Sequence, residues 1–139
     1  CQSNKKIETA NDLKGFKIRV PVSPLWTSMF KDLGASPTGI NFSEVYSALQ
    51  AGVVDGAENN VTALTSGRHG EVCKFYSETE HQIVPDVLVM SAARWDSLKK
   101  PQQEIIKKAA IDSFEYQKSL SEKEREKVQW TWKRLTKWL

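Results

Sequence analysis

The sequence predicts an α/β fold, because short strand-like segments alternate with helical segments along residues 16–76. Strands are expected at 16–20 and at 37–40, and a third begins at 53–54 and runs into residues 55–60; each is followed by a helical stretch. This order is typical of parallel strands. A continuous apolar run at 87–90 predicts a further strand buried on both faces, and the stretch after Pro101, free of glycine and proline, predicts a long C-terminal helix.

The first strand and helix follow from local residue choice. Residues 16–20 alternate apolar and basic side chains until Pro21 ends the strand. Ser23 is a favourable N-cap, and Pro24 suits the first helical position. The helix ends at Gly34, and its apolar stripe at four-residue spacing consists of Leu25, Met29 and Leu33.

The later elements carry similar signals. Asn41 or Ser43 can cap a helix over 44–51, and a region at 62–76 reads as helix interrupted by two glycines. Continued to residue 139, the C-terminal helix would be on the order of 55 Å long. A domain of this size does not cover that length, so the far end of the helix is expected to lack a partner within the chain.

Composition indicates one globular domain. The chain has 139 residues, 40% hydrophobic and 27% charged, and no apolar run approaches the roughly 20 residues of a membrane-spanning helix. Residues 1–98 hold nine Lys and Arg against eleven Asp and Glu, whereas residues 99–139 hold eleven against six. The basic residues of the tail alternate with Glu, as on a solvated helix, so no nucleic-acid partner is expected.

The cysteines and histidines show no metal-ligand or redox spacing, so no metal site and no cofactor is expected. Cys1 fits either the lipid-bearing start of a mature lipoprotein or an ordinary residue at a fragment boundary. No signal peptide is recognisable in this chain. Isolated in sequence, His69 and His81 are expected in surface or loop positions.

Motifs of enzymatic catalysis are also missing. The sequence has no GxSxG, GxGxxG or GxxxxGK[ST] motif. Asp55 and Glu58 follow a predicted strand and would suit an acid/base pair, but a turn of this kind more often ties down its own backbone. No catalytic residue is therefore expected, and an enzyme is the third-ranked class.

Binding residues, in contrast, follow the predicted strands at positions that face a common crevice. Arg19 lies at the carboxyl end of the first strand, shortly before Pro21, and offers a planar fork of donors to a carboxylate, although a surface arginine would have the same spacing. Ser23, Phe42 and Asn59 occupy the segments that follow the three strands. Together they would supply a hydroxyl, an apolar wall and an amide to one ligand.

Three segments then carry a resemblance to a known family: DLKGFKIRVPVS, GASPTGINFSEVYSALQAGVVDGAEN and HQIVPDVLVMSAARWDSL. They resemble the second half of a dicarboxylate-type TRAP-transporter periplasmic solute-binding protein, from about residue 9 to residue 120. The resemblance implies a lobe of the periplasmic-binding-protein (type II-like) fold over residues 1–84. A crossing strand and a long helix over 85–139 would then normally pack on a first lobe.

The resemblance also implies a function. Arg19 would hold the carboxylate of a small organic acid, with contacts from Ser23, Phe42, Asn59 and Asp86. The loaded protein would be periplasmic and would deliver its ligand to a TRAP membrane permease. A homodimer or a segment-swapped assembly is a further expectation.

The runner-up function belongs to another class. Residues 130–139 do not resemble the family, and they include Trp130, Trp132 and Trp138 beside basic residues. Because Trp is enriched at binding hot spots, this tail would suit a small basic interaction module that grips a protein partner.

Overall fold

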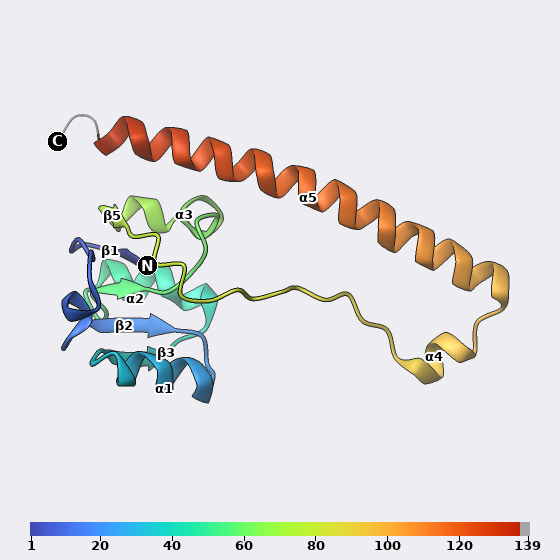
Figure 1. The fold of residues 1–139 in the computed structure, drawn as a ribbon, viewed down its shortest axis with the longest axis horizontal. Helices are drawn as coiled ribbons and strands as arrows, with labels where there is room; N and C mark the ends of the chain where they lie inside the picture. Colours follow the sequence, from blue (N-terminus) through green and yellow to red (C-terminus); the bar gives the residue numbers. More distant parts are fainter. Residues whose placement is uncertain (137–139) are drawn as a thin grey trace.

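Five short strands form one mixed sheet, and the rest of the lobe is built on it (Figure 1). The computed structural model describes the backbone of residues 1–136 and the side chains of residues 1–128. In the sheet order β3-β2-β4-β1-β5, β2 is parallel to β3 and β4, whereas β1 is antiparallel to β4 and β5. The strands are β1 (Gln2–Ser3), β2 (Lys17–Val20), β3 (Ser36–Gly39), β4 (Gly56–Ala57) and β5 (Phe75–Tyr76).

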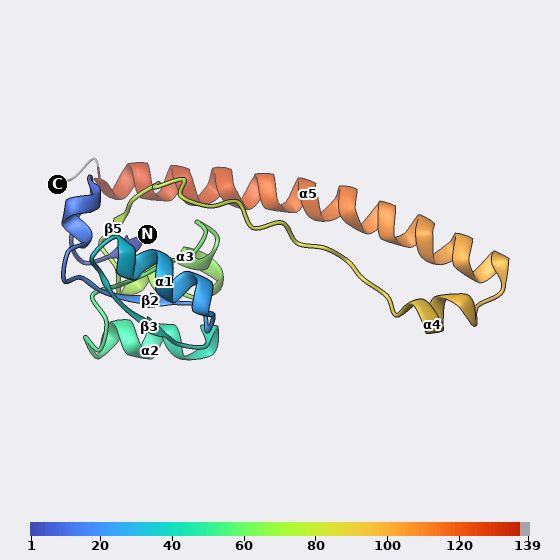
Figure 2. The same ribbon diagram turned by 60° about the horizontal axis from the view of Figure 1, so that its bottom comes forward.

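The parallel half of the sheet confirms the predicted alternation of strands and helices. Helix α1 (Pro24–Asp32) links β2 to β3, α2 (Val45–Gln50) links β3 to β4, and α3 (Ala63–Ser66) follows β4. Figure 2 shows α1 and α2 on opposite sides of the sheet. Each helix covers its own core, so the lobe has helix layers on both faces, as parallel sheets require.

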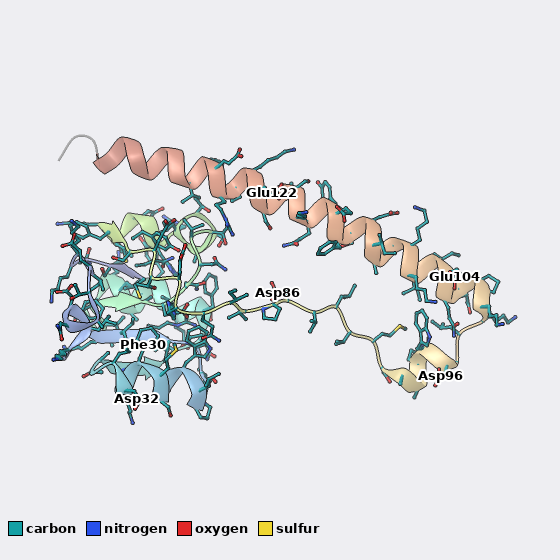
Figure 3. All side chains as sticks on the ribbon, viewed as in Figure 1. Phe30, Asp32, Asp86, Asp96, Glu104 and Glu122 are labelled. Carbon is teal, nitrogen blue, oxygen red and sulfur yellow. The ribbon has the colours of Figure 1, made fainter. Side chains whose placement is uncertain are left out.

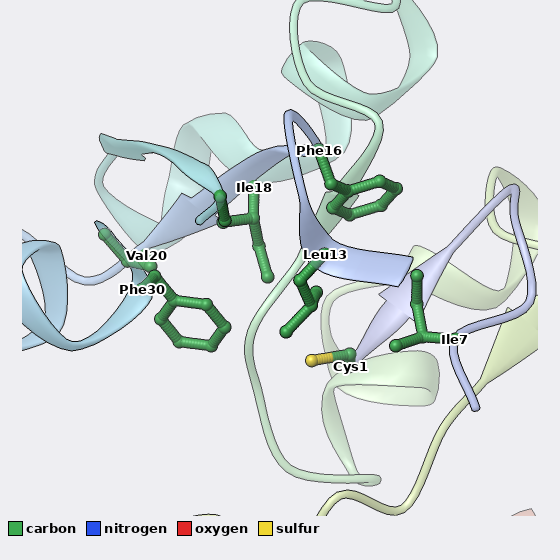
Figure 4. Close-up of a cluster of buried hydrophobic side chains, with 8 residues drawn as sticks. Cys1, Ile7, Leu13, Phe16, Ile18, Val20 and Phe30 are labelled. Atoms are coloured by element: carbon green, nitrogen blue, oxygen red, sulfur yellow. The ribbon is translucent and has the colours of Figure 1, made fainter. Parts of the chain in front are cut away.

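Alternation along β2 assigns its side chains to the two faces. Ile18 and Val20 are fully buried against α1 and share one apolar cluster with Phe30 of that helix (Figure 4). Arg19 stands between these two residues in sequence and therefore points to the opposite face, where Val45 and Leu49 of α2 and Ala57 of β4 form the second core.

The predicted turn before β2 is present as a short 3-10 helix, Ala10–Leu13. The Asp12 carboxylate accepts hydrogen bonds from the backbone N–H of Thr9 at 2.8 Å and from its hydroxyl at 3.1 Å. Gly15 closes the turn at a φ of 70°, a conformation that favours glycine.

Two features of the sheet differ from the sequence prediction. The third parallel strand covers only Gly56–Ala57, and Val53, predicted to begin it, is 59% exposed in the preceding turn. The sequence also gave no signal for β1, which inserts between β4 and β5. A two-residue strand shows no alternation that could reveal it.

Residues 82–91 leave the lobe as an extended chain that leads to α4 (Ala92–Asp96) (Figure 1). The prediction of a buried strand at 87–90 was wrong for this chain, because Val87 and Leu88 are 75% and 81% exposed. Among residues 1–136 no strand lies beside this segment, and a strand forms only where a neighbour accepts its hydrogen bonds.

Helix α5 (Lys100–Thr136) runs back from α4 toward the lobe and confirms the predicted long helix (Figures 1 and 2). Its far end does have a partner, contrary to expectation: the Thr65 hydroxyl of α3 donates to Glu124 Oε1 at 2.8 Å, and Val128 is buried. Most of α5 before Val128 is nevertheless exposed, including Ile105 at 68% and Phe114 at 61%.

Within residues 1–136, no helix combines the length and the apolar character that crossing a membrane requires. Trp130 and Trp132 belong to α5, but their side chains, like all of Trp138, lie outside the described part of the chain. The alternative role for this tail therefore stays a prediction.

Candidate functional site

Arg19 lies at the carboxyl edge of the parallel strands. It is the third residue of β2, pairs with Thr38 of β3 and Ala57 of β4, and is only 4% exposed. A buried arginine must have acceptors for its N–H groups, because an unpaired buried charge is strongly destabilising.

Two backbone carbonyls supply those acceptors. Arg19 Nε donates to Ile40 O at 2.8 Å, and Nη1 donates to Glu58 O at 3.3 Å. Ile40 directly follows β3 and Glu58 directly follows β4, so the guanidinium bridges the two loops that leave the neighbouring strands. The other N–H groups of the guanidinium have no protein acceptor within residues 1–128.

The carboxylate of Glu58 interacts electrostatically with this cation. Burial raises the pKa of the Glu58 carboxyl, while the N-terminal ammonium and Arg19 oppose that rise. Burial likewise lowers the pKa of Arg19, and the charge of Glu58 opposes the change. Arginine remains protonated under all ordinary conditions, so the edge keeps a fixed positive charge.

Three further predicted residues lie in the segments that follow β2, β3 and β4. Ser23 is the N-cap residue of α1, but its hydroxyl makes no capping bond. Phe42 begins the 3-10 turn Phe42–Glu44, and its side chain is 47% exposed. Asn59 is partly exposed, and its Oδ1 accepts a hydrogen bond from the backbone N–H of Asn60 at 2.9 Å. The topology therefore places all three at the edge that holds Arg19.

Asp86 is placed differently from the other four. It lies on the extended segment that leaves the lobe and is exposed there (Figure 3). Within the described residues, no hydrogen bond or ion pair joins Asp86 to the sheet edge, so its predicted ligand contact remains an expectation.

The acidic residues that suggested catalysis are not paired. Asp55 precedes β4, where its Oδ2 accepts a hydrogen bond from the backbone N–H of Lys17 at 3.0 Å, whereas Glu58 follows β4 at the opposite end. Asp55 thus binds the backbone of the neighbouring strand β2, whereas the sequence suggested a bond to the backbone of its own turn. Within residues 1–128, no three His, Cys, Asp or Glu side chains gather as a metal site would need.

A surface hollow of about 390 Å³ lies at the amino edge of the same strands, and Arg19 is not among the residues that line it. Lys14, Gly15 and Phe16, which precede β2, line it together with Asp55. Because ligands of open α/β sheets bind outside the carboxyl ends of the strands, we assign the binding edge to Arg19 and not to this hollow.

Two residues at the site escaped the sequence prediction. His69 was expected at the surface or in a loop, but its ring is fully buried in the turn His69–Glu71. Gln2 of β1 is also fully buried, and its Oε1 lies 2.6 Å from His69 Nδ1. These residues are 67 positions apart, so no local pattern reveals their contact.

As a whole, the carboxyl edge presents a buried cation, a hydroxyl, an amide and an exposed aromatic ring. A guanidinium with free N–H groups binds a carboxylate in a charge-assisted geometry. Hydroxyl and amide groups suit the hydroxyls of a polar ligand, and an aromatic ring suits its carbon skeleton. In chemical terms, these groups together are suited to a small polar anion.

Known proteins show the same sequence pattern. The family model described as bacterial extracellular solute-binding protein, family 7, matches residues 1–134. The protein YiiZ of Salmonella typhimurium is 44% identical over 126 residues, which make up 91% of this chain and 38% of that relative. The match of the family model continues beyond residue 120, where the resemblance noted in the sequence ends.

Solved structures agree in fold. A TRAP periplasmic solute-binding protein from Bradyrhizobium with bound galacturonate is 42% identical, with a TM-score of 0.85 over 96% of this chain and 45% of that one. A counterpart from Roseobacter denitrificans with bound glucuronate is 35% identical, with a TM-score of 0.89 over 96% of this chain and 44% of that one. The chain thus spans less than half the length of these proteins, and the α/β fold class with its long C-terminal helix is confirmed.

Proposed function

Because this chain belongs to family 7 of the bacterial extracellular solute-binding proteins, we propose that it forms one wall of a pocket for a small sugar acid, in which Arg19 binds the carboxylate. The observation that carries the proposal is the burial of Arg19 at the carboxyl edge of the sheet. Some N–H groups of its guanidinium have no hydrogen-bond acceptor among residues 1–128. A fold gains little stability from burying such a cation, so a function explains it better.

The ligand class follows from the groups around Arg19 and from the uronates bound in two similar structures. A uronate has one carboxylate and several hydroxyls on a ring with apolar faces. Arg19 would bind the carboxylate, Ser23 and Asn59 would accept or donate to hydroxyls, and Phe42 would pack on the ring. Asp86 would accept a hydrogen bond from a further hydroxyl.

The proposal extends to the surroundings of the protein. Family 7 proteins are transport components and not enzymes, and the similar structures are described as periplasmic TRAP proteins. We therefore expect the gene product to work in the periplasm and to pass its ligand to the membrane permease of a TRAP transporter.

Calorimetry on the full-length gene product tests the role of Arg19. D-galacturonate and D-glucuronate are the ligands, and neutral D-galactose is the control ligand. Since a hydrogen bond to a charged group contributes about 1.5–3 kcal/mol, Arg19→Met is expected to weaken uronate binding about 10- to 100-fold. Lys17→Met is the matched control, because it removes a charge from an exposed position of the same strand and should leave the affinity unchanged.

Two results would contradict the proposal. One is equal uronate affinity of the wild type and a folded Arg19→Met variant. The other is equal affinity of the wild type for galactose and galacturonate, which would show that no group of the protein distinguishes the carboxylate.

A further inference from the structure

We propose that His69 is a positioning residue of the sugar-acid pocket. Its ring contacts the Phe42 ring directly, and through Gln2 it holds the loop that carries Asn59. This inference rests on the proposed function. It starts from the burial of a polar ring that the family resemblance and the sequence pattern assign to no role: His69 is fully buried, and so is the Gln2 side chain bonded to it.

A chain of hydrogen bonds links His69 to the loop. The side-chain amide of Gln2 donates from Nε2 to Asn60 O at 3.1 Å, which turns its Oε1 toward His69 Nδ1 at 2.6 Å. An amide oxygen only accepts hydrogen bonds, so Nδ1 must carry the proton. Asn60 in turn donates its backbone N–H to Asn59 Oδ1 at 2.9 Å, so the Asn59 side chain is oriented by a loop that Gln2 and His69 hold.

The ring of His69 also supports the aromatic wall. Its centroid lies 5.5 Å from that of Phe42, with an angle of 48° between the ring planes. Nearly half of Phe42 is exposed to solvent, so the buried imidazole of His69 supports the ring from the protein side. A ring held on one side keeps its orientation when no ligand is bound, which lowers the cost of binding.

His69 has a single compatible proton arrangement in this environment. Its Nε2 has no hydrogen-bond partner within the described residues, and a Cβ at Gly67 would lie only 2.7 Å from it. Burial lowers the pKa of His69, and the charge of Arg19 lowers it further. The ring is therefore neutral and protonated on Nδ1, which leaves Arg19 as the cation of this edge.

Exposed side-chain contacts stabilise the turn that contains His69. Arg68, at a φ of 57°, donates from Nε and Nη2 to the Glu71 carboxylate at 2.8 Å each. The same guanidinium lies 5.4 Å from the ring centre of Tyr46, whose hydroxyl donates to Glu71 at 3.1 Å. These exposed contacts connect the His69 turn to α2 and keep the imidazole in place beneath Phe42.

A double-mutant cycle in the full-length gene product tests the proposal, with D-galacturonate as the ligand. His69→Phe keeps an aromatic ring but removes the donor, and Gln2→Met keeps the side-chain length but removes both hydrogen bonds. Each is expected to weaken binding about tenfold, and the double variant little more than either, because both changes break one connection. Ser66→Ala is the control, since the Ser66 hydroxyl donates only to Thr62 O within its own turn.

The measurements separate positioning from mere stability. A purely structural histidine would lower the unfolding temperature but leave the affinity of the folded protein unchanged, so affinities within twofold of the wild type in folded His69→Phe and Gln2→Met would overturn the proposal. Additive losses in the double variant would overturn the link through Gln2.

A ligand-free measurement distinguishes this inference from the proposed function. If the wild type binds no uronate, the proposed function fails, and amide hydrogen exchange of Asn60 and Ala63, whose N–H groups donate to Asn59 Oδ1 and Asn60 O, still tests the connection. Faster exchange in His69→Phe and Gln2→Met, but not in Ser66→Ala, would support it. Exchange equal to the wild type in all three variants would overturn it.

Discussion

At the scale of single residues, two buried polar side chains that destabilise the fold lie where ligand binding is proposed. Arg19 is a buried cation, and His69 is a buried imidazole with an unpaired nitrogen. Apolar residues at either position would be cheaper for folding. Departures of this kind are expected at functional sites, where geometry and charge matter more than stability.

The neutral state of His69 predicts a pH dependence of stability. Its folded pKa is lowered from 6.5, so below that pH the unfolded chain takes up a proton that the folded chain does not. This imbalance makes the free energy of unfolding decrease as the pH falls below about 6.5, and the decrease ends near the folded pKa.

Urea unfolding between pH 5 and 7.5 measures this effect as the difference between the wild type and His69→Phe. The difference isolates His69, because His81, whose pKa is also lowered, and Glu58, whose pKa is raised, remain in both proteins. The wild type is expected to lose more stability on acidification than the variant. Parallel curves would mean that His69 titrates alike in the folded and unfolded chain.

At the scale of secondary-structure elements, the insertion of β1 into the sheet depends on a close backbone approach. A Cβ at Gly56 of β4 would lie 2.6 Å from Gln2 O of β1 and 2.8 Å from the Phe16 ring. Only glycine allows this packing. The same close approach places the Gln2 side chain within hydrogen-bond distance of His69 and Asn60.

Gly56→Ala is therefore expected to destabilise the protein by about 2 kcal/mol or more, since backbone of a sheet cannot yield as a flexible side chain does. Gly39→Ala, at the end of β3, is the control, because a Cβ there has its nearest contact at 3.4 Å. Chemical denaturation of both variants checks the prediction. Equal stabilities would refute the close approach of β1 to β4.

At the scale of the whole molecule, the lobe is joined to an arm with much exposed apolar surface. The extended segment and the first half of α5 turn large apolar side chains to solvent; they include Ile83 at 92%, Leu88 at 81% and Phe114 at 61%. The similar structures are more than twice as long as this chain. Apolar patches of this kind are rare on monomers that act alone.

The 139-residue chain produced by itself is therefore expected to bind an apolar fluorescent dye and to self-associate, as a dimer or a swapped assembly. Replacing Val87, Leu88 and Val89 with Ser should lower the dye signal severalfold. Sedimentation velocity gives the oligomeric state. A clean monomer without dye binding would contradict the expectation.

Sequence reasoning predicted the fold where local residue choice controls structure. Pro21, Ser23 and Gly34 mark the ends of β2 and α1 correctly to within one or two residues. The prediction of a strand at 87–90 was wrong because an apolar run shows only that a segment is suited to a buried strand. A strand also needs a neighbouring strand to pair with. The contact of the far end of α5 with α3 was missed for a related reason, since length alone does not show where a helix returns to the lobe.

The sequence by itself determined the parallel β-α-β order, the long helix and the family, because periodicity, capping residues and motifs are local properties of the chain. It also singled out Arg19, Ser23, Phe42 and Asn59, since each lies near the carboxyl end of a strand or in the segment that follows one. Only the tertiary structure decided that Arg19 is buried between two loop carbonyls and that His69 lies beneath Phe42 with Gln2 as its partner. Those contacts join residues from 21 to 67 positions apart, and the burial that creates them depends on the packing of the whole sheet.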